Sequence, residues 1–281
     1  LAVAAKFYPV LLLGGFLLLS LRSGRWRAFG ALVGGTALAW LVVNVPFMMT
    51  NAEGWSYFYR FSSERGEDFG SIYFMLTELD LPSIPADSLN TLATGLFIVL
   101  CAAIVILSLR LQRRPRLMQV LFLIVAAFAI TNKVYSPQYV LWLIPLAVLA
   151  RPRWRDFLLW QVGEVIYFAA IWWFLVGYGN DSEKGLPPQG YSLAILIHVA
   201  ATVYFAVMVI RDMVRPECDP VRTDGFAEDA DDPAGGDGRA AVVGVGTGER
   251  HRAGACLREG PGAGHAAGIR AARGLGELDT G

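Results

Sequence analysis

Seven long apolar runs constrain the fold of this chain more than any other feature of its sequence. They cover roughly residues 1–21, 28–47, 93–110, 116–131, 135–150, 157–178 and 190–211. Most of them reach the approximately 20 residues that an α-helix needs to cross a bilayer. The chain is 55% hydrophobic, with a mean hydropathy of +0.46, well above a soluble average. The sequence therefore predicts an all-α, polytopic transmembrane helix bundle of about seven spans.

The placement of arginines predicts how the spans are oriented. The loops after the first, third and fifth runs are rich in arginine, whereas the intervening short loops hold only Lys133 and Lys184. The positive-inside rule puts the arginine loops in the cytoplasm. The long loop 48–92, the turn 132–138 and the loop 179–190 then face outward. We therefore expect a multi-pass protein of the plasma membrane.

Two parts are expected along the chain. Residues 1–215 form the transmembrane domain. Residues 216–281 are rich in glycine and contain one aromatic residue, Phe226, so they cannot bury a core and are expected to form a disordered cytoplasmic tail. The chain begins at Leu1, without a methionine and already inside an apolar run, so we expect it to be N-terminally incomplete.

A polar insertion separates the fourth and fifth runs, which are about 16 residues each and could form a tilted or partly re-entrant hairpin. It holds Lys133, Tyr135, Ser136 and Gln138, and Pro137 should break the helix there. Such groups at membrane depth are costly unless they have partners or a function. The Lys133 ammonium could bind an anion such as phosphate, or it could reach the outer headgroups like any lysine near a span end. Lys6 could likewise bind an anion or reach the outer headgroups.

The outer loop 48–92 is long for a connector, and such loops are often functional. Its segment Trp55–Phe74 holds eight aromatic residues among scattered charges. This pattern suits sugar rings, and it equally suits a membrane interface, where residues 71–81 could form a short helix on the surface. The candidate substrate residues of this loop are Trp55, Arg60, Arg65 and Asp68. The two arginines could bind phosphate or pair with nearby acids.

Three features inside the spans have mainly structural interpretations. Glu164 is the one acid well inside a span, and we expect it to form a hydrogen bond to a neighbouring helix rather than to act on a substrate. Gly30 and Gly34 form a G-x-x-x-G pair that favours close helix contact. The three histidines are scattered, so neither a metal site nor a cofactor is expected.

Three motifs together resemble glycosyltransferase family 87, in its actinobacterial members. They are K-F-Y-P at residues 6–9, W-S-Y-F-Y-R-F-S-S-E-R-G-E-D-F-G-S at 55–71, and K-V-Y-S-P-Q-Y-V-L-W-L-I-P at 133–145. The resemblance covers about residues 1–212. It implies a C-type membrane mannosyltransferase, which transfers a hexose from a polyprenyl-phosphate donor to a lipid or glycan acceptor on the outer face.

The resemblance also implies roles for particular groups. A carboxylate takes the proton of the acceptor hydroxyl, and cations hold the departing lipid phosphate. The candidate phosphate-binding residues are Lys133, Tyr135, Ser136, Gln138 and Lys6. In C-type enzymes the catalytic carboxylate lies in the first outer loop, so we expect the general base to precede residue 1. Whether this chain is active alone stays open.

Two other functions remain open. A transporter or flippase of lipid-linked sugars would use a similar basic and aromatic cavity, although it should also contain internal repeats, and no convincing repeat is found. An inactive, truncated membrane protein would have the same spans. The expected partners are the polyprenyl-phosphate sugar donor, the lipid or glycan acceptor and membrane lipids, but no nucleic acid.

Overall fold

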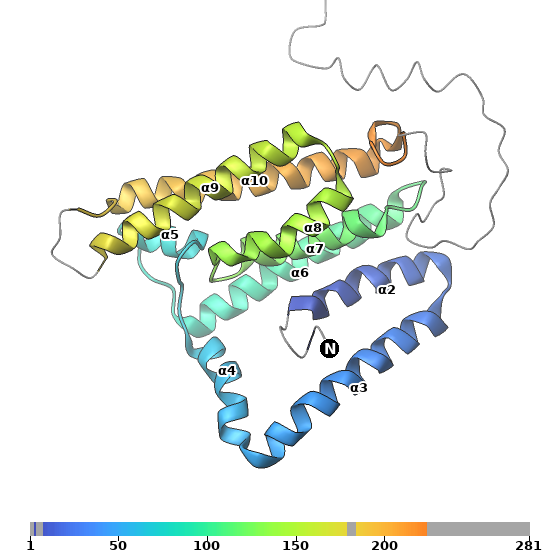
Figure 1. The fold of residues 1–281 in the computed structure, drawn as a ribbon, viewed down its shortest axis with the longest axis horizontal. Coiled ribbons are helices and arrows are strands. Elements are labelled where there is room, and N and C mark those ends of the chain that lie inside the picture. Colours follow the sequence, from blue (N-terminus) through green and yellow to red (C-terminus); the bar gives the residue numbers. More distant parts are fainter. Residues whose placement is uncertain (1–2, 4–7, 179–183, 224–281) are drawn as a thin grey trace, which may run out of the picture.

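The computed structural model describes residues 3, 8–178 and 184–223. Its helices are η1 (Tyr8–Leu11), α2 (Leu12–Ser23), α3 (Trp26–Thr50), α4 (Ala52–Glu64), α5 (Ile72–Glu78), α6 (Ala86–Arg110), α7 (Leu117–Thr131), η2 (Pro137–Tyr139), α8 (Val140–Ala150), α9 (Trp154–Gly177), α10 (Pro188–Val214) and η3 (Pro216–Cys218). No strand occurs in this part of the chain, so the predicted all-α membrane helix bundle is confirmed (Figure 1).

Four helices, α3, α6, α9 and α10, are long and apolar enough to cross a membrane. Three shorter apolar helical segments, Tyr8–Ser23, Leu117–Thr131 and Pro137–Ala150, coincide with the other predicted runs. At ~1.5 Å per residue, α7 is about 22 Å long, less than the ~30 Å of a hydrocarbon core. The helical segments thus lie where the sequence places them, although they differ in length.

Helix α7 forms the centre of the bundle. It contacts α2, α6, α8 and α10, and most of its 15 residues are buried. Val120 and Phe122 have no exposed surface, and they pack with Trp160 and Phe205 of the neighbouring helices α9 and α10. A helix that is apolar on every side must be surrounded by protein or by lipid, and α7 is surrounded by other helices. The apolar run 116–131 therefore forms the core of the bundle.

Helix α5 packs against the bundle, chiefly against α10. Its aromatic residues Tyr73 and Phe74 are buried, and Phe74 lies in a cluster with Tyr167 and Phe174 of α9 and Tyr191 of α10. The prediction of a short helix within 71–81 is confirmed, and its place on the membrane surface stays a prediction.

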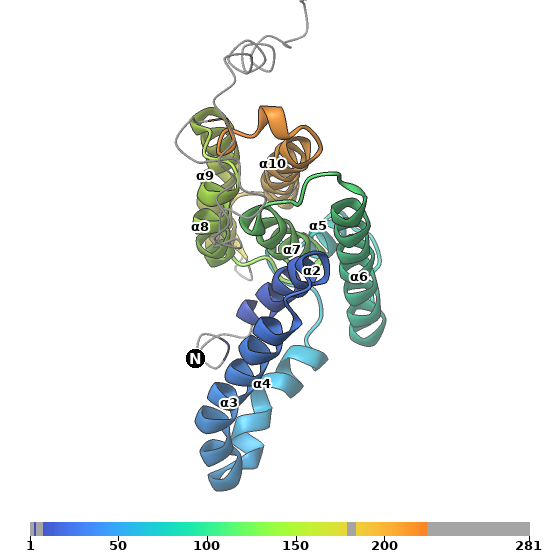
Figure 2. The same ribbon diagram turned by 90° about the vertical axis from the view of Figure 1, so that its right-hand side faces the viewer.

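Helices α3 and α4 extend away from the rest of the bundle in both ribbon views (Figures 1 and 2). No residue of α3 is buried. A Cβ atom added at Gly30 or at Gly34 would meet nothing within 4 Å. The close helix contact expected at this pair is therefore absent from the part of the chain that the structure describes.

The arginine-rich segments gather at the end of the bundle opposite the polar insertion. Arg22 donates hydrogen bonds to the carbonyls of Ser108 and Leu111, at 2.5 and 2.9 Å. Two of the arginines that the sequence assigns to loops, Arg116 and Arg151, are buried, with 3% and 1% exposure. Their charges are compensated inside the protein, so they add less to the positive-inside pattern than their number indicates.

The first residues beyond α10 fold back onto the bundle. Asp219 has no exposed surface, and it accepts hydrogen bonds from Arg116 Nε at 2.7 Å and from Gln119 Nε2 at 3.1 Å. Residues 216–223 therefore pack as part of the helical domain and not as the start of the tail. The rest of the expected tail, residues 224–281, lies outside the described residues.

Candidate functional site

Two segments that are far apart in the sequence lie side by side at one end of the bundle. We call residues 65–71 the Arg65 segment and residues 132–136 the Lys133 segment. The backbone N–H of Asp68 donates to the carbonyl of Lys133 at 2.9 Å, and the N–H of Tyr135 donates to the carbonyl of Phe69 at 3.2 Å. These bonds join the motif of the long loop to the polar insertion.

The Lys133 side chain is enclosed where these segments meet the start of α6. The residue is 7% exposed, and its Nζ donates to the carbonyl of Arg65 at 2.5 Å and to Oδ1 of Asn90 at 2.6 Å. Asn90 in turn donates from Nδ2 to the carbonyl of Ser63 at 2.7 Å. Within the described part of the chain, no carboxylate pairs with Lys133. Only neutral oxygens therefore hold the ammonium.

Electrostatics make this ammonium receptive to an anion. Burial lowers the pKa of Lys133, and the nearby charge of Arg65 lowers it further. Arg65 forms an ion pair with Asp68, and its guanidinium carbon lies 5.4 Å from the centre of the Phe61 ring. The junction thus holds two cations and two carboxylates, because Glu67 also belongs to the Arg65 segment, where it accepts a hydrogen bond from Thr77 at 3.0 Å. An added anion would offset both causes of the lowered pKa, because a charged lysine is costly only while it lacks a counter-charge.

The other candidates of the polar insertion are placed differently. The Tyr135 hydroxyl lies inside the bundle, 3.5 Å from Oε1 of Glu164 and 3.5 Å from Oγ1 of Thr202. Ser136 is half-buried at the start of η2, and Gln138 is exposed. Lys6 lies outside the described residues. The structure therefore separates the Tyr135 hydroxyl from the Lys133 ammonium, although only one residue stands between them.

The candidates of the long loop divide into two pairs. Arg65 and Asp68 lie beside the Lys133 segment. Trp55 and Arg60 lie on α4, where Trp55 donates to Oδ1 of Asn44 on α3 at 3.0 Å, and Arg60 pairs with the exposed Glu53 at 3.8 Å. This separation has a physical reason, because α4 ends before the Arg65 segment turns into the bundle.

A buried polar cluster that includes Glu164 and Thr202 surrounds the Tyr135 hydroxyl, and it is not among the sites expected from the sequence. Oε1 of Glu164 accepts hydrogen bonds from Trp160 at 3.1 Å and from Thr202 at 3.0 Å. The interhelical hydrogen bond predicted for Glu164 is therefore confirmed, since Thr202 belongs to α10. His198, one of the three scattered histidines, is fully buried one turn before Thr202. The four-residue spacings 160/164 and 198/202 were the available signal for this cluster.

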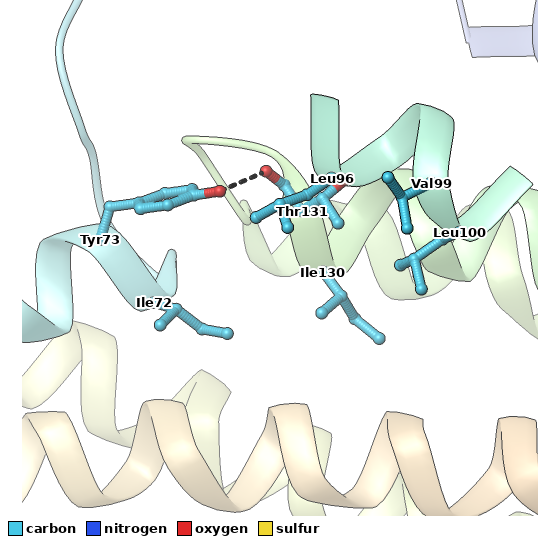
Figure 3. A pocket seen from close by; sticks show the side chains of 7 residues that line it. All are labelled: Ile72, Tyr73, Leu96, Val99, Leu100, Ile130 and Thr131. Atoms are coloured by element: carbon cyan, nitrogen blue, oxygen red, sulfur yellow. Dashed lines mark hydrogen bonds between the residues drawn. The ribbon is translucent and has the colours of Figure 1, made fainter. Parts of the chain in front are cut away.

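An apolar groove opens beside the junction (Figure 3). It has a volume of about 200 Å³ and is lined by Ile72 and Tyr73 of α5, Leu96, Val99 and Leu100 of α6, and Ile130 and Thr131 of α7. The Tyr73 hydroxyl donates to the carbonyl of Thr131 at 3.1 Å, which fixes one wall. Thr131 directly precedes the Lys133 segment in the sequence, so the groove adjoins the backbone of that segment.

Gly70 is where the Arg65 segment passes closest to the bundle. Its φ of +79° favours glycine, and a Cβ atom there would collide with the Tyr167 hydroxyl and with the carbonyl of Tyr135. We expect Gly70→Ala to lower the free energy of unfolding by about 1–3 kcal/mol in detergent micelles. The matched control is Gly66→Ala in the same segment, where a Cβ meets nothing within 4 Å. Equal effects of the two changes would contradict this account.

Comparison with known proteins adds to this geometry. Residues 1–131 match the family model of glycosyltransferase family 87. Over this part of the sequence, the chain is similar to glycosyltransferase family 87. No curated protein and no solved structure matches the chain. The glycosyltransferase match includes the Arg65 segment, the apolar helices on either side of it and all of α7, and it ends just before the Lys133 segment. The chain is thus a membrane protein with a glycosyltransferase-family region, and such enzymes act on a sugar donor and an acceptor.

Proposed function

We propose that this chain works as part of an integral membrane glycosyltransferase that takes a hexose from a polyprenyl-phosphate donor. The acceptor is a lipid or a glycan on the outer face of the plasma membrane, and mannose is the sugar that the sequence resemblance implies. One observation carries the proposal, namely the enclosed Lys133 ammonium without a carboxylate partner at the junction of the two motifs.

The donor phosphate is the anion that fits this junction. A phosphate near the edge of a bilayer is strongly disfavoured without a positive partner. Lys133 and Arg65 offer two cations, while Asn90 and the backbone supply neutral polar groups beside them. When the sugar leaves, negative charge grows on the lipid phosphate, and fixed cations stabilise that charge more than the ground state. Lys133 would therefore speed the transfer as well as bind the donor.

The apolar groove supports a lipid donor over a nucleotide donor. Its lining is almost entirely hydrocarbon, and it starts beside the Lys133 segment. A hydrocarbon chain can lie in such a groove while the phosphate at its end meets the ammonium. A nucleotide would instead need polar partners for its base and ribose, which the groove does not provide.

None of the three described carboxylates near the junction is assigned the role of general base. Asp68 is engaged with Arg65, and Glu67 accepts a hydrogen bond from Thr77. Glu164 is enclosed by hydrogen bonds from Trp160 and Thr202. A general base must reach the acceptor hydroxyl, which calls for an accessible carboxylate. Our proposal for these residues is therefore confined to donor binding and leaving-group stabilisation.

The proposal is tested in membranes from cells that express the full chain. Polyprenyl-phosphate hexose, labelled in the sugar, is supplied in one set of vesicles and a labelled nucleotide hexose in another. We expect the label to enter a new lipid or glycan product only from the polyprenyl donor. Movement of the intact donor across the membrane without a new glycosidic bond would instead indicate a transporter and would reject the proposal, as would transfer from the nucleotide sugar alone.

A further inference from the structure

Two buried side chains, one on α9 and one on α10, contact backbone carbonyls of the candidate site. The Tyr167 hydroxyl donates to the carbonyl of Tyr135 at 2.9 Å, and Nε2 of His198 lies 3.3 Å from the carbonyl of Gly70. One of these carbonyls belongs to the Lys133 segment and the other to the Arg65 segment. Each of the two paired segments is thus bound by one residue of the helical core.

The His198 ring has little freedom to turn. It is stacked between the rings of Tyr135 and Tyr167, with centroids 4.5 and 4.1 Å away and interplanar angles of 19° and 18°. Oε2 of Glu164 lies 3.8 Å from Nδ1, on the other side of the imidazole. Because a carbonyl only accepts hydrogen bonds, Nε2 must carry the proton that faces Gly70. The stacked rings fix the direction of that N–H.

We propose that His198 and Tyr167 are positioning residues, which set the register of the two segments and thereby hold Lys133 beside Arg65. Gly70 stands two residues after Asp68, whose N–H binds the Lys133 carbonyl, and Tyr135 stands two residues after Lys133. Each of the two carbonyls thus lies two residues from a residue of the Asp68–Lys133 backbone hydrogen bond. Loss of the contact to either carbonyl therefore loosens the backbone that holds Lys133 in place. The effect on sugar transfer rests on the function proposed above, whereas the effect on the Lys133 side chain does not.

The role requires hydrogen-bond donors and not merely rings of the right shape. Tyr167→Phe keeps the ring and removes only the hydroxyl. His198→Phe keeps an aromatic ring but removes the donor, whereas His198→Gln offers an amide N–H for the Gly70 carbonyl. A structural role in packing alone would rank the phenylalanine variant above the glutamine variant at position 198, and the proposed role predicts the opposite rank.

The first measurement follows the Lys133 amine directly. Membranes with the full chain are treated with a small amine-acylating reagent, and the modified peptides are quantified by mass spectrometry. The chain has three lysines, Lys6, Lys133 and Lys184, and the exposed Lys184 serves as an internal reference. We expect Tyr167→Phe and His198→Phe to raise the labelling of Lys133 relative to Lys184 by about three- to tenfold. This factor corresponds to the loss of one hydrogen bond. His198→Gln should stay close to the unsubstituted chain.

A matched control separates local loosening from general destabilisation. Tyr204 also lies on α10, and its hydroxyl donates to Oδ1 of Asp156 at 2.8 Å at the opposite end of the bundle. Tyr204→Phe therefore removes a comparable hydrogen bond, and it should leave Lys133 labelling unchanged. Equal labelling of Lys133 in Tyr204→Phe and Tyr167→Phe, or no increase in the latter, would overturn the proposal.

Sugar transfer gives the second readout. With the polyprenyl donor, Tyr167→Phe should lower kcat/KM by about three- to tenfold, in proportion to the rise in labelling, and His198→Gln should restore most of what His198→Phe loses. The labelling could change as expected while neither the unsubstituted chain nor any variant transfers sugar. In that case the proposed function fails and the positioning role stands. If transfer occurs but labelling does not change, the positioning role fails alone.

Discussion

Lys133→Ala is expected to lower kcat/KM for the polyprenyl donor by about 100- to 1,000-fold. This is the usual loss when one fixed group that stabilises charge in the transition state is removed. The ammonium is enclosed and held by the Arg65 carbonyl and Asn90, so its charge meets little screening by solvent. The measurement is the initial rate of sugar transfer in membranes at several donor concentrations.

Two further variants give the Lys133 experiment its controls. Lys184→Ala removes an exposed lysine in the loop before α10, and it should leave the kinetics unchanged. Lys133→Arg keeps the charge, but its planar fork does not reproduce the geometry of an ammonium between two acceptors, so we expect an intermediate loss. Folding is checked by thermal unfolding, because alanine leaves two acceptors without their donor. A folded Lys133→Ala chain with unchanged donor kinetics would reject phosphate binding by Lys133.

Arg151→Ala is expected to lower the free energy of unfolding by about 3–5 kcal/mol, the cost of leaving buried charges without their partner. The Arg151 side chain has no exposed surface, and its guanidinium pairs with Asp156 at 2.7 Å and also with Asp212. Alanine would leave two carboxylates enclosed at the end of the bundle opposite Lys133. The measurement is denaturant unfolding of the chain in detergent micelles.

The neighbouring Arg155 supplies a matched control. It pairs with the same Asp156 at 3.0 Å, but its side chain is 73% exposed. Arg155→Ala should therefore cost no more than about 1 kcal/mol, as for other exposed ion pairs. The triple change Arg151→Met, Asp156→Asn and Asp212→Asn removes all three charges and should recover much of the loss. Similar costs for Arg151→Ala and Arg155→Ala would contradict this account of the network.

Local properties of the sequence determined the helices. The hydrophobic runs are dense enough that each one must become a helix in a membrane, whatever its neighbours are. The same reasoning singled out the polar insertion, because Lys133 lies between two apolar runs. The proximity of Arg65 and Lys133 was not predictable in this way, because backbone hydrogen bonds between two segments leave no mark in the side-chain pattern.

Burial of charge was the main point that the sequence could not decide. Arg116 and Arg155 look alike in a list of loop arginines, yet one is buried against Asp219 and the other is exposed. The difference depends on where residues 216–223 return to the bundle, which is a long-range contact. For the same reason, the unpacked face of Gly30 and Gly34 could not be foreseen from the G-x-x-x-G spacing.

The sequence by itself thus determined an all-helical membrane protein and the position of its most unusual lysine, since hydropathy acts over a single segment. Only the tertiary structure decided which groups surround that lysine, and that His198, Glu164 and the tyrosines gather behind it. Hydropathy fixes which segments avoid water. The partners of a buried polar group depend on which helices meet, and that choice is made by packing over the whole chain.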